Sequence, residues 1–306
     1  MCKVSVIIPT YKHRDFVLAT LDSVFAQTFT DYEVIVVNDG SPDDTADVLK
    51  PLAEAGRIRY IEQANQGQAA ARNCGIAEAS GDFVALLDDD DLWPSDKLSW
   101  QVASLRDHPD AVFVYGGTSL VGGDFNLAEH GETEYPLHPG ETGPSGYVYE
   151  ELLVRNPLYS PGQALIRTAT LKQINGFDEN IWGADDYDLY IRLAREGRFL
   201  YRNHCALYYR KHSNNASANL LKMYKNVCSV RRKHLGRFPR LSSYRLWLKS
   251  YLYWRGSYLD DMLTAVRLYT KEGNKSRARQ VWCWALMMPP KFTHLRYMFY
   301  LLRCLR

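Results

Sequence analysis

Four consecutive aspartates, Asp88–Asp91, follow the apolar run FVALL at positions 83–87. Adjacent carboxylates repel one another, so a run of four at the end of a strand needs a counter-charge. A hard divalent cation shared between carboxylate and pyrophosphate oxygens would supply it. The alternative is an acidic turn that caps the following helix, because Asp is a preferred capping residue. The run therefore predicts either a cation site or a helix cap.

A second acidic pair, Asp185 and Asp186, opens the segment WGADDYDLYIRLAREG at 182–197, whose apolar spacing is that of an amphipathic helix. The helix dipole stabilises negative charge at this end. A carboxylate held there, close to a reacting hydroxyl, can act as a general base. Simple N-terminal capping is the competing interpretation.

Three further side chains are candidates for binding polar ligands. Asp39 lies in VVNDGSPDDT, where its carboxylate can accept from a nucleobase N–H or a ribose hydroxyl, although Asn-Asp-Gly is also an ordinary turn. Arg72 lies near the start of an Ala-rich helix beside a glycine-containing loop, which suits phosphate binding or a plain surface position. His212, in YYRKHSNNAS, is either a metal or phosphate ligand or a structural loop histidine.

Strands and helices alternate through the first 90 residues, which predicts an α/β fold with a mostly parallel sheet covered on both faces. Such a sheet binds ligands beyond the carboxyl ends of its strands, where the polar residues above fall. Ser41 is predicted to cap a helix with Pro42 in its first position. Residues 116–150 are expected to form loops and short strands, and residues from about 220 onward to be helical. The predicted strands are 4–9, 32–37, 58–62 and 83–87, and the predicted helices include 13–27, 68–79 and 185–196.

Charge divides the 306-residue chain unequally. Of 37 Lys and Arg residues 19 lie in 221–306, with only 3 of the 35 Asp and Glu residues, so this segment carries +16 and residues 1–220 carry −14. Aromatic, Leu and basic residues alternate there at near-helical spacing, which is typical of helices lying in a membrane interface. A helical subdomain with a basic outer surface is the alternative. No RNA- or DNA-binding motif accompanies the charge, and no nucleic-acid partner is expected.

The six cysteines have no metal-type spacing, which favours reduced thiols in the cytosol. The amino terminus lacks the long apolar region of a signal peptide, and no stretch approaches the length of a membrane span. GxGxxG and GxxxxGK[ST] are both missing, which argues against a dinucleotide oxidoreductase and a P-loop NTPase.

Taken in order, the segments that begin at VSVIIPTYKHRD, NQGQAAARNCG, GFDENIWGADDYD and YYRKHSNNAS resemble the family 2 glycosyltransferases of the GT-A fold, over residues 1–217. The resemblance implies an inverting enzyme that uses a nucleotide-diphosphate sugar, with UDP-sugars favoured, and Mn²⁺ or Mg²⁺. It also implies a GT-A domain at 1–219, with a nucleotide-binding half at about 1–115 and an acceptor half at about 116–219, followed by a basic helical region at 220–306.

The resemblance carries roles to individual positions. Asp186 matches the catalytic base, with Asp185 as a competing candidate because Asp-Asp stands where Glu-Asp is common. Asp88 and Asp90 match the metal-binding DxD positions, and His212 and Asn215 match a motif that closes over the diphosphate, with His212 a further metal candidate. The positions implied for donor binding are Pro9, Thr10, Tyr11, Asp39, Asn65, Arg72, Asp88 and Asp89.

The expected activity is glycosyl transfer to a glycan or lipid-linked acceptor in bacterial surface polysaccharide synthesis, at the cytoplasmic face of the membrane. A sugar nucleotidyltransferase is one alternative, although the loop PTYKHRD lacks the glycine such enzymes carry after their first strand. A catalytically degenerate binding scaffold is the other, although Asp88, Asp90 and Asp186 are all present.

Overall fold

A computed structural model describes residues 3–125, 143–212, 215, 219–236 and 243–286. The chain divides into two compact units. The first comprises residues 1–152 and 156–215, and the second comprises residues 153–155 and 216–306.

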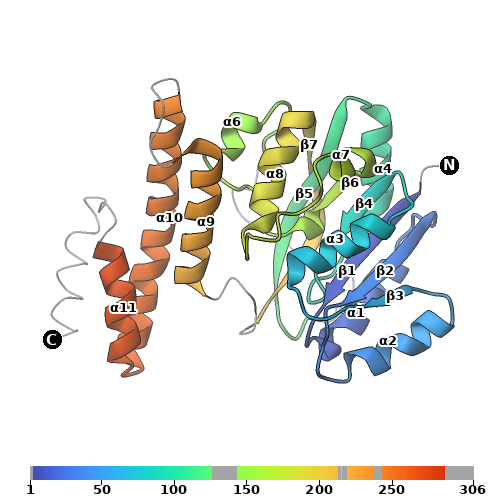
Figure 1. The fold of residues 1–306 in the computed structure, drawn as a ribbon, viewed down its shortest axis with the longest axis horizontal. Coiled ribbons are helices and arrows are strands. Elements are labelled where there is room, and N and C mark those ends of the chain that lie inside the picture. The colour runs from blue at the N-terminus through green and yellow to red at the C-terminus, as the bar shows by residue number, and fades with distance from the viewer. Residues whose placement is uncertain (1–2, 126–142, 213–214, 216–218, 237–242, 287–306) are drawn as a thin grey trace. The chain divides into compact units, whose positions relative to one another are not determined.

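A seven-stranded sheet forms the centre of the first unit, in the order β3-β2-β1-β4-β6-β5-β7 (Figure 1). Strands β1 to β4 run parallel to one another, β6 is antiparallel to both of its neighbours, and β5 and β7 are parallel. The strands are β1 Val4–Thr10, β2 Tyr32–Asn38, β3 Arg59–Glu62, β4 Phe83–Leu86, β5 Ala111–Gly122, β6 Ala164–Arg167 and β7 Arg198–Lys211. The predicted α/β class and mostly parallel sheet are confirmed.

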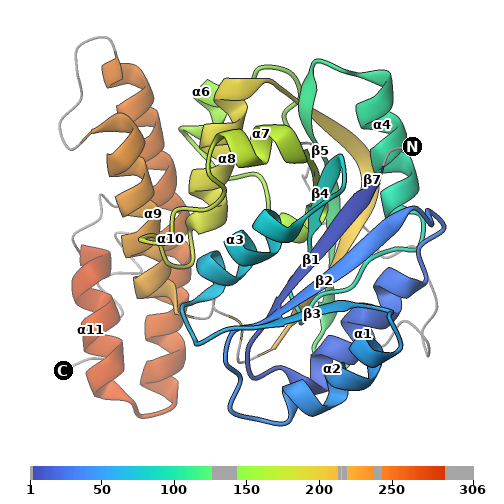
Figure 2. The ribbon, with the colours of Figure 1, turned by 45° about the vertical axis from the view of Figure 1, so that its right-hand side comes forward.

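Helices cover both faces of this sheet (Figure 2). Helices α1 (Arg14–Phe25), α2 (Thr45–Glu54) and α4 (Lys97–Asp107) share one apolar core with Val4, Val6 and Ile8 of β1. The opposite face receives α3 (Gln68–Glu78), whose Gly75 lies directly on Ile7. Helices α7 (Thr168–Gln173) and α8 (Asp185–Glu196) lie on the same side as α3, and short segments α6 (Tyr149–Leu152) and η1 (Pro161–Gln163) complete the unit.

Two predicted elements differ from the structure. Helix α2 begins at Thr45 rather than after Ser41, because Asp43 accepts hydrogen bonds from the Thr45 backbone and hydroxyl, at 3.3 and 2.6 Å. Ser41 is engaged elsewhere, since its hydroxyl accepts from the Lys12 N–H. Residues 116–122, predicted as loop or short strand, continue β5, which pairs along its length with β7 despite its paired glycines. The rest of the expected flap, 126–142, lies outside the described residues.

The second unit is helical, as predicted for residues after 220. It contains α9 (Leu220–Leu235), α10 (Tyr244–Lys271) and α11 (Lys275–Leu286). These helices share their own core, with Tyr224, Leu263 and Trp282 among its members. The interfacial region was predicted for residues 221–306, of which 237–242 and 287–306 lie outside the described residues. In the described part of the chain, no helix combines the length and the apolar character needed to cross a bilayer.

Candidate active site

The carboxyl ends of three parallel strands meet at one edge of the sheet. β1 ends at Thr10, which is in register with Asn38 at the end of β2. β4 ends at Leu86, and Asp88–Asp91 follow after Leu87. Pro9 and Thr10 are buried, whereas the Tyr11 side chain is 39% exposed. The topology therefore brings the predicted nucleoside-binding positions and the four aspartates to the same edge.

Asp39 holds the loop between β3 and α3. One carboxylate oxygen accepts from Gln63 Nε2 at 2.7 Å and the Gln66 N–H at 2.9 Å, and the other accepts from the Gly67 N–H at 2.8 Å. A Cβ on Gly40 would lie 2.9 Å from the backbone nitrogen of Asn65, and Gly40 has a φ of +68°, so the loops approach closely only because this residue is glycine. Asn65 itself is exposed in that loop.

Asp89 is bonded to the start of α1. Its carboxylate lies 2.7 Å from His13 Nδ1 and accepts from the Tyr11 N–H at 3.2 Å. The hydrogen bond to Asp89 raises the pKa of His13 from 6.5 to about 9 despite the opposing effect of burial. Asp89 was predicted to bind the donor, and the structure places its carboxylate in an ion pair with protonated His13.

Both carboxylate oxygens of Asp88 accept hydrogen bonds. Oδ1 accepts from Arg72 Nη2 at 2.6 Å and from Gln68 Nε2 at 3.1 Å, and Oδ2 accepts from the Ser160 hydroxyl at 3.1 Å. Each carboxylate oxygen offers two lone pairs. Oδ1 is therefore filled, and Oδ2 keeps one acceptor position that none of the described residues occupies.

Arg72 connects this carboxylate with the second acidic pair. Its side chain is 3% exposed and donates from Nη1 to Asp185 Oδ2 at 2.8 Å, while Nη2 bonds to Asp88. A buried guanidinium is tolerated where two carboxylates compensate its charge. Arg72 was predicted to contact the nucleotide, and in the structure it lies between the two acidic motifs.

The two candidates for the base have different surroundings. Asp185 is buried and paired with Arg72. Asp186 is only partly buried, and Oδ1 accepts from the Tyr187 N–H at 2.7 Å. Burial, followed by the charge of Asp185, raises the pKa of Asp186 to about 7. Burial also raises the pKa of Asp185, although the charge of Arg72 opposes it. What separates the two candidates is therefore the ion pair with Arg72, which engages Asp185 and leaves Asp186 without a cationic partner among the described residues.

Asp90 faces the segment after β7. Its Oδ2 lies 3.1 Å from His212 Nε2 and accepts from Asn215 Nδ2 at 3.3 Å. The His212 ring stacks on Phe16 with ring centroids 4.8 Å apart. Burial, then the charges of Asp89 and Asp88, raise the pKa of Asp90 to about 7. Among the described residues no group donates to Asp90 Oδ1.

These features fit a divalent cation bound mainly by substrate. Asp88 Oδ2 and Asp90 Oδ1 are hard oxygen ligands with acceptor positions that no described residue fills, and burial, followed by the charges of Asp89 and Asp88, raises the pKa of Asp90. Within the described ranges, no three His, Cys, Asp or Glu side chains converge to form a complete cation cage. Mg²⁺ and similar ions are commonly held by one or two carboxylates together with substrate phosphates, and the pair Asp88 and Asp90 fits that pattern.

Three residues at this edge were missed by sequence reasoning. Ser160 bonds to Asp88, His13 pairs with Asp89, and Arg210 donates its backbone N–H to Asp91 Oδ1 at 3.1 Å and its Nε to the carbonyl of Asp90. The sequence held one signal, since Ser160-Pro-Gly-Gln163 has the spacing of a capping box. The pairing of His13 and Arg210 with distant aspartates has no local signature.

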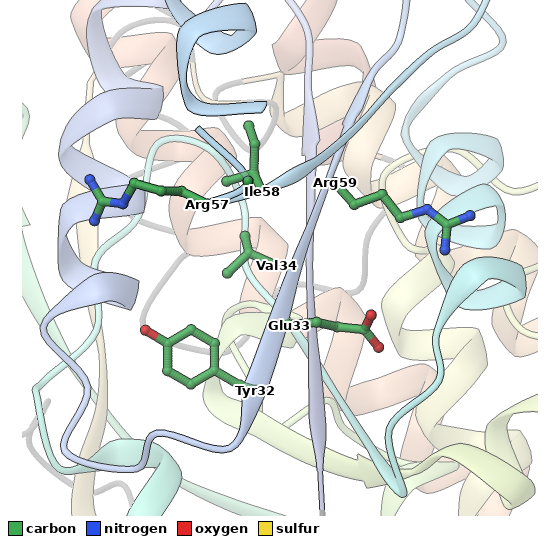
Figure 3. A pocket seen from close by; sticks show the side chains of 7 residues that line it. Tyr32, Glu33, Val34, Arg57, Ile58 and Arg59 are labelled. Atoms are coloured by element: carbon green, nitrogen blue, oxygen red, sulfur yellow. The ribbon is translucent and has the colours of Figure 1, made fainter. Parts of the chain in front are cut away.

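A hollow elsewhere on the sheet is unrelated to these residues. It is lined by Tyr32–Val34 at the start of β2 and by Gly56–Arg59. Figure 3 shows Arg57, which precedes β3, and Arg59, which begins it, pointing to opposite sides of that strand. The hollow lies at the start of β2, at the opposite end of that strand from Asn38 and the acidic motifs.

Comparison with known proteins identifies the family. Residues 5–174 match the model of glycosyl transferase family 2. An uncharacterized glycosyltransferase of Rickettsia felis is 35% identical over 192 residues, which are 63% of this chain and 30% of that protein. The chain thus spans about a third of that relative's length. The putative teichuronic acid biosynthesis glycosyltransferase TuaG of Bacillus subtilis is 32% identical over 75% of this chain and 87% of its own.

Solved structures show the same fold. S. aureus TarS 1–349 in complex with UDP-GlcNAc aligns with a TM-score of 0.60 and 18% identity, over 91% of this chain and 90% of that one. The mannosyltransferase PcManGT from Pyrobaculum calidifontis, in complex with GDP-Man and Mn²⁺, aligns with a TM-score of 0.59 and 19% identity, over 98% and 85%. The predicted GT-A fold and family are confirmed: the chain belongs to glycosyl transferase family 2.

Proposed function

We propose that this glycosyltransferase moves a sugar, with inversion, from a nucleotide-diphosphate donor to a glycan or lipid-linked acceptor of a bacterial surface polysaccharide. A UDP-sugar is the favoured donor, and Mn²⁺ or Mg²⁺ the cofactor. The observation that carries the proposal is the link Asp88–Arg72–Asp185, in which one buried guanidinium joins a candidate cation ligand to the neighbour of Asp186, the candidate base.

The residues divide the chemistry between them. Asp88 Oδ2 and Asp90 Oδ1 would hold the cation, which neutralises charge developing on the departing nucleoside diphosphate. Asp186 removes the proton of the acceptor hydroxyl as it attacks the anomeric carbon. Asp185 is neutralised by Arg72 and positions that guanidinium, so it is the weaker candidate for the base.

TuaG and the two solved structures support the proposal by analogy. TuaG is named for teichuronic acid biosynthesis, TarS was solved with UDP-GlcNAc, and PcManGT with GDP-Man and Mn²⁺. The basic charge of residues 221–306 supports attachment to an anionic membrane surface on the cytoplasmic side, where a lipid-linked acceptor would be met.

The test is Asp186→Asn, assayed for sugar transfer and for nucleotide affinity. Transfer should fall by about 10²-fold or more, because general-base catalysis contributes roughly 10²–10⁴-fold, while UDP affinity is retained. Asp185→Asn is the matched control and should retain the greater part of the activity. Lost nucleotide binding in Asp186→Asn would assign Asp186 a structural or metal-binding role. Undiminished transfer would remove it as the base.

A further inference from the structure

Ser160 is a buried serine in contact with one of the candidate metal ligands. It is 2% exposed, and its hydroxyl donates to Asp88 Oδ2 at 3.1 Å. The other oxygen of Asp88 is occupied by Arg72 and Gln68. Ser160 therefore bonds to the oxygen of Asp88 to which no other residue in the described part of the chain donates.

The direction of the Ser160 proton is fixed by its other contact. Ser160 caps the short helix η1, and its oxygen accepts from the Gly162 N–H at 3.1 Å in a capping box with Gln163. Capping requires only that the hydroxyl accept a bond. The bond that it donates to Asp88 is thus additional to capping, and it links η1 to the acidic run.

Helix α4 and the turn before it fix the position of η1. Trp93 Nε1 donates to the carbonyl of Gly162 at 2.8 Å, and Gln101 Nε2 donates to that of Gln163 at 2.8 Å. Lys97 Nζ lies 3.3 Å from the carbonyl of Ala164 and 3.8 Å from the centroid of the Trp93 ring.

Lys97 and Gln101 lie one turn apart on the same side of α4, and Trp93 lies just before that helix. Trp93 is 1% exposed, and Lys97 and Gln101 are fully buried. Burying a lysine is costly and burial lowers its pKa well below the usual value. Three buried side chains thus donate hydrogen bonds to three consecutive carbonyls, those of residues 162–164, close to Ser160.

We propose that Ser160 is a positioning residue for the cation site, whose hydroxyl orients Asp88 so that the free lone pair of Oδ2 can ligate the donor's divalent cation. This rests on the proposed function. Residues that orient metal ligands in this way commonly change metal affinity by about 10- to 100-fold when removed.

The experiment compares UDP binding by calorimetry in Mn²⁺ and in EDTA for the full chain. Ser160→Ala should weaken UDP binding about 10-fold or more in Mn²⁺ and leave binding in EDTA unchanged. Ser160→Gly should give the same result. It controls for misfolding of the alanine variant, because replacing a capping serine by glycine costs only a few tenths of a kcal/mol. Ser160→Thr, which keeps the hydroxyl, should restore Mn²⁺-dependent binding.

Ser5→Ala is the matched control. Ser5 is fully buried, accepts from the Gly81 N–H at 2.9 Å and donates to the Glu33 carboxylate at 2.6 Å, so it repeats the Ser160 pattern away from the acidic run. It should lower the thermal midpoint without changing UDP binding in either condition.

The outcomes separate the two proposals. Wild-type protein that binds no nucleotide in Mn²⁺ would overturn the proposed function and this inference with it. Wild-type binding that Ser160→Ala and Ser160→Gly leave unchanged would overturn this inference alone. An equal loss in Mn²⁺ and in EDTA would do the same, because it would show a structural role without a metal-specific part.

Discussion

At the scale of single residues, the site is defined by which carboxylates are already paired. Asp89 is paired with His13 and Asp185 with Arg72. Burial raises the pKa of Asp185 despite that pair, and burial and neighbouring carboxylates raise the pKa values of Asp90 and Asp186. These two, together with Asp88 Oδ2, are the groups left for a cation and a proton.

The raised pKa of Asp186 predicts how transfer depends on pH. A base must be deprotonated to act, so kcat/KM should rise with pH through a midpoint near 7. Asp185→Asn removes a negative charge that raises this pKa, so the rise should move to lower pH. The measurement is a pH–rate profile of both proteins with a fixed donor and saturating Mn²⁺. A midpoint that Asp185→Asn leaves in place or shifts upward would contradict the assignment.

Sequence reasoning was most informative about residue types and least about pairing. The acidic motifs could be found because aspartates cluster after an apolar strand and at a helix start. The partner of each carboxylate could not, since Arg72 and Asp185 are joined across 113 positions and Asp90 and His212 across 122. Such pairs depend on tertiary packing, which no local pattern encodes.

At the scale of elements, the position of Arg72 depends on how closely α3 approaches β1. A Cβ on Gly75 would lie 2.4 Å from Ile7 Cγ2, a distance that requires movement. Gly75 follows Arg72 by less than one turn on α3. Glycine therefore allows the close helix–strand packing from which Arg72 reaches both acidic motifs.

Gly75→Ala should destabilise the protein by about 1–3 kcal/mol, the usual cost of overpacking, although alanine is the better helix former. Urea unfolding measures the change. Combined with Ile7→Ala, which makes room for the added methyl, the loss should be smaller than the sum of the single losses. Strict additivity would show that the two side chains do not compete for the same space.

The predicted elements were closest to the structure where periodicity was strong. Helix α8 spans the predicted 185–196, and β1 to β4 lie within one residue of the predicted bounds at each end. The start of α2 was wrong because the Ser41 hydroxyl is bonded to the backbone of Lys12, leaving the role of cap to the residues before Thr45. Residues 116–122, predicted as loops and short strands, instead continue the long strand β5, because pairing with the distant strand β7 holds their glycines.

At the scale of the whole molecule, charge separates the two units. The helical unit uses some of its arginines internally, since Arg231 lies over Trp247 and Tyr251, and Arg255 over Tyr251. Arg245 and Lys249 are exposed one turn apart on α10. These two are among several exposed basic residues of this unit that can contact an anionic surface.

The membrane proposal predicts binding to anionic liposomes at low salt that weakens as salt is added, because exposed charges are screened. Arg245→Gln with Lys249→Gln should weaken binding, by roughly 1 kcal/mol for each charge that reaches the surface. The control is Lys50→Gln with Arg106→Gln, which removes two exposed charges from the first unit. Flotation with vesicles measures both. Failure of the wild-type protein to bind anionic vesicles would reject the membrane proposal. The helical unit would then be a subdomain with a basic outer surface.

The central claim is that Asp88 and Asp90 bind a nucleotide-sugar donor through a divalent cation. The most direct measurement is a calorimetric titration of the wild-type protein with UDP, GDP and dTDP, each in Mn²⁺ and in EDTA. We predict binding of one nucleotide, UDP, that depends on Mn²⁺ and is lost in Asp90→Asn. Folded protein that binds none of the three in Mn²⁺ would contradict the claim, and the acidic run would then be a structural feature of a binding scaffold.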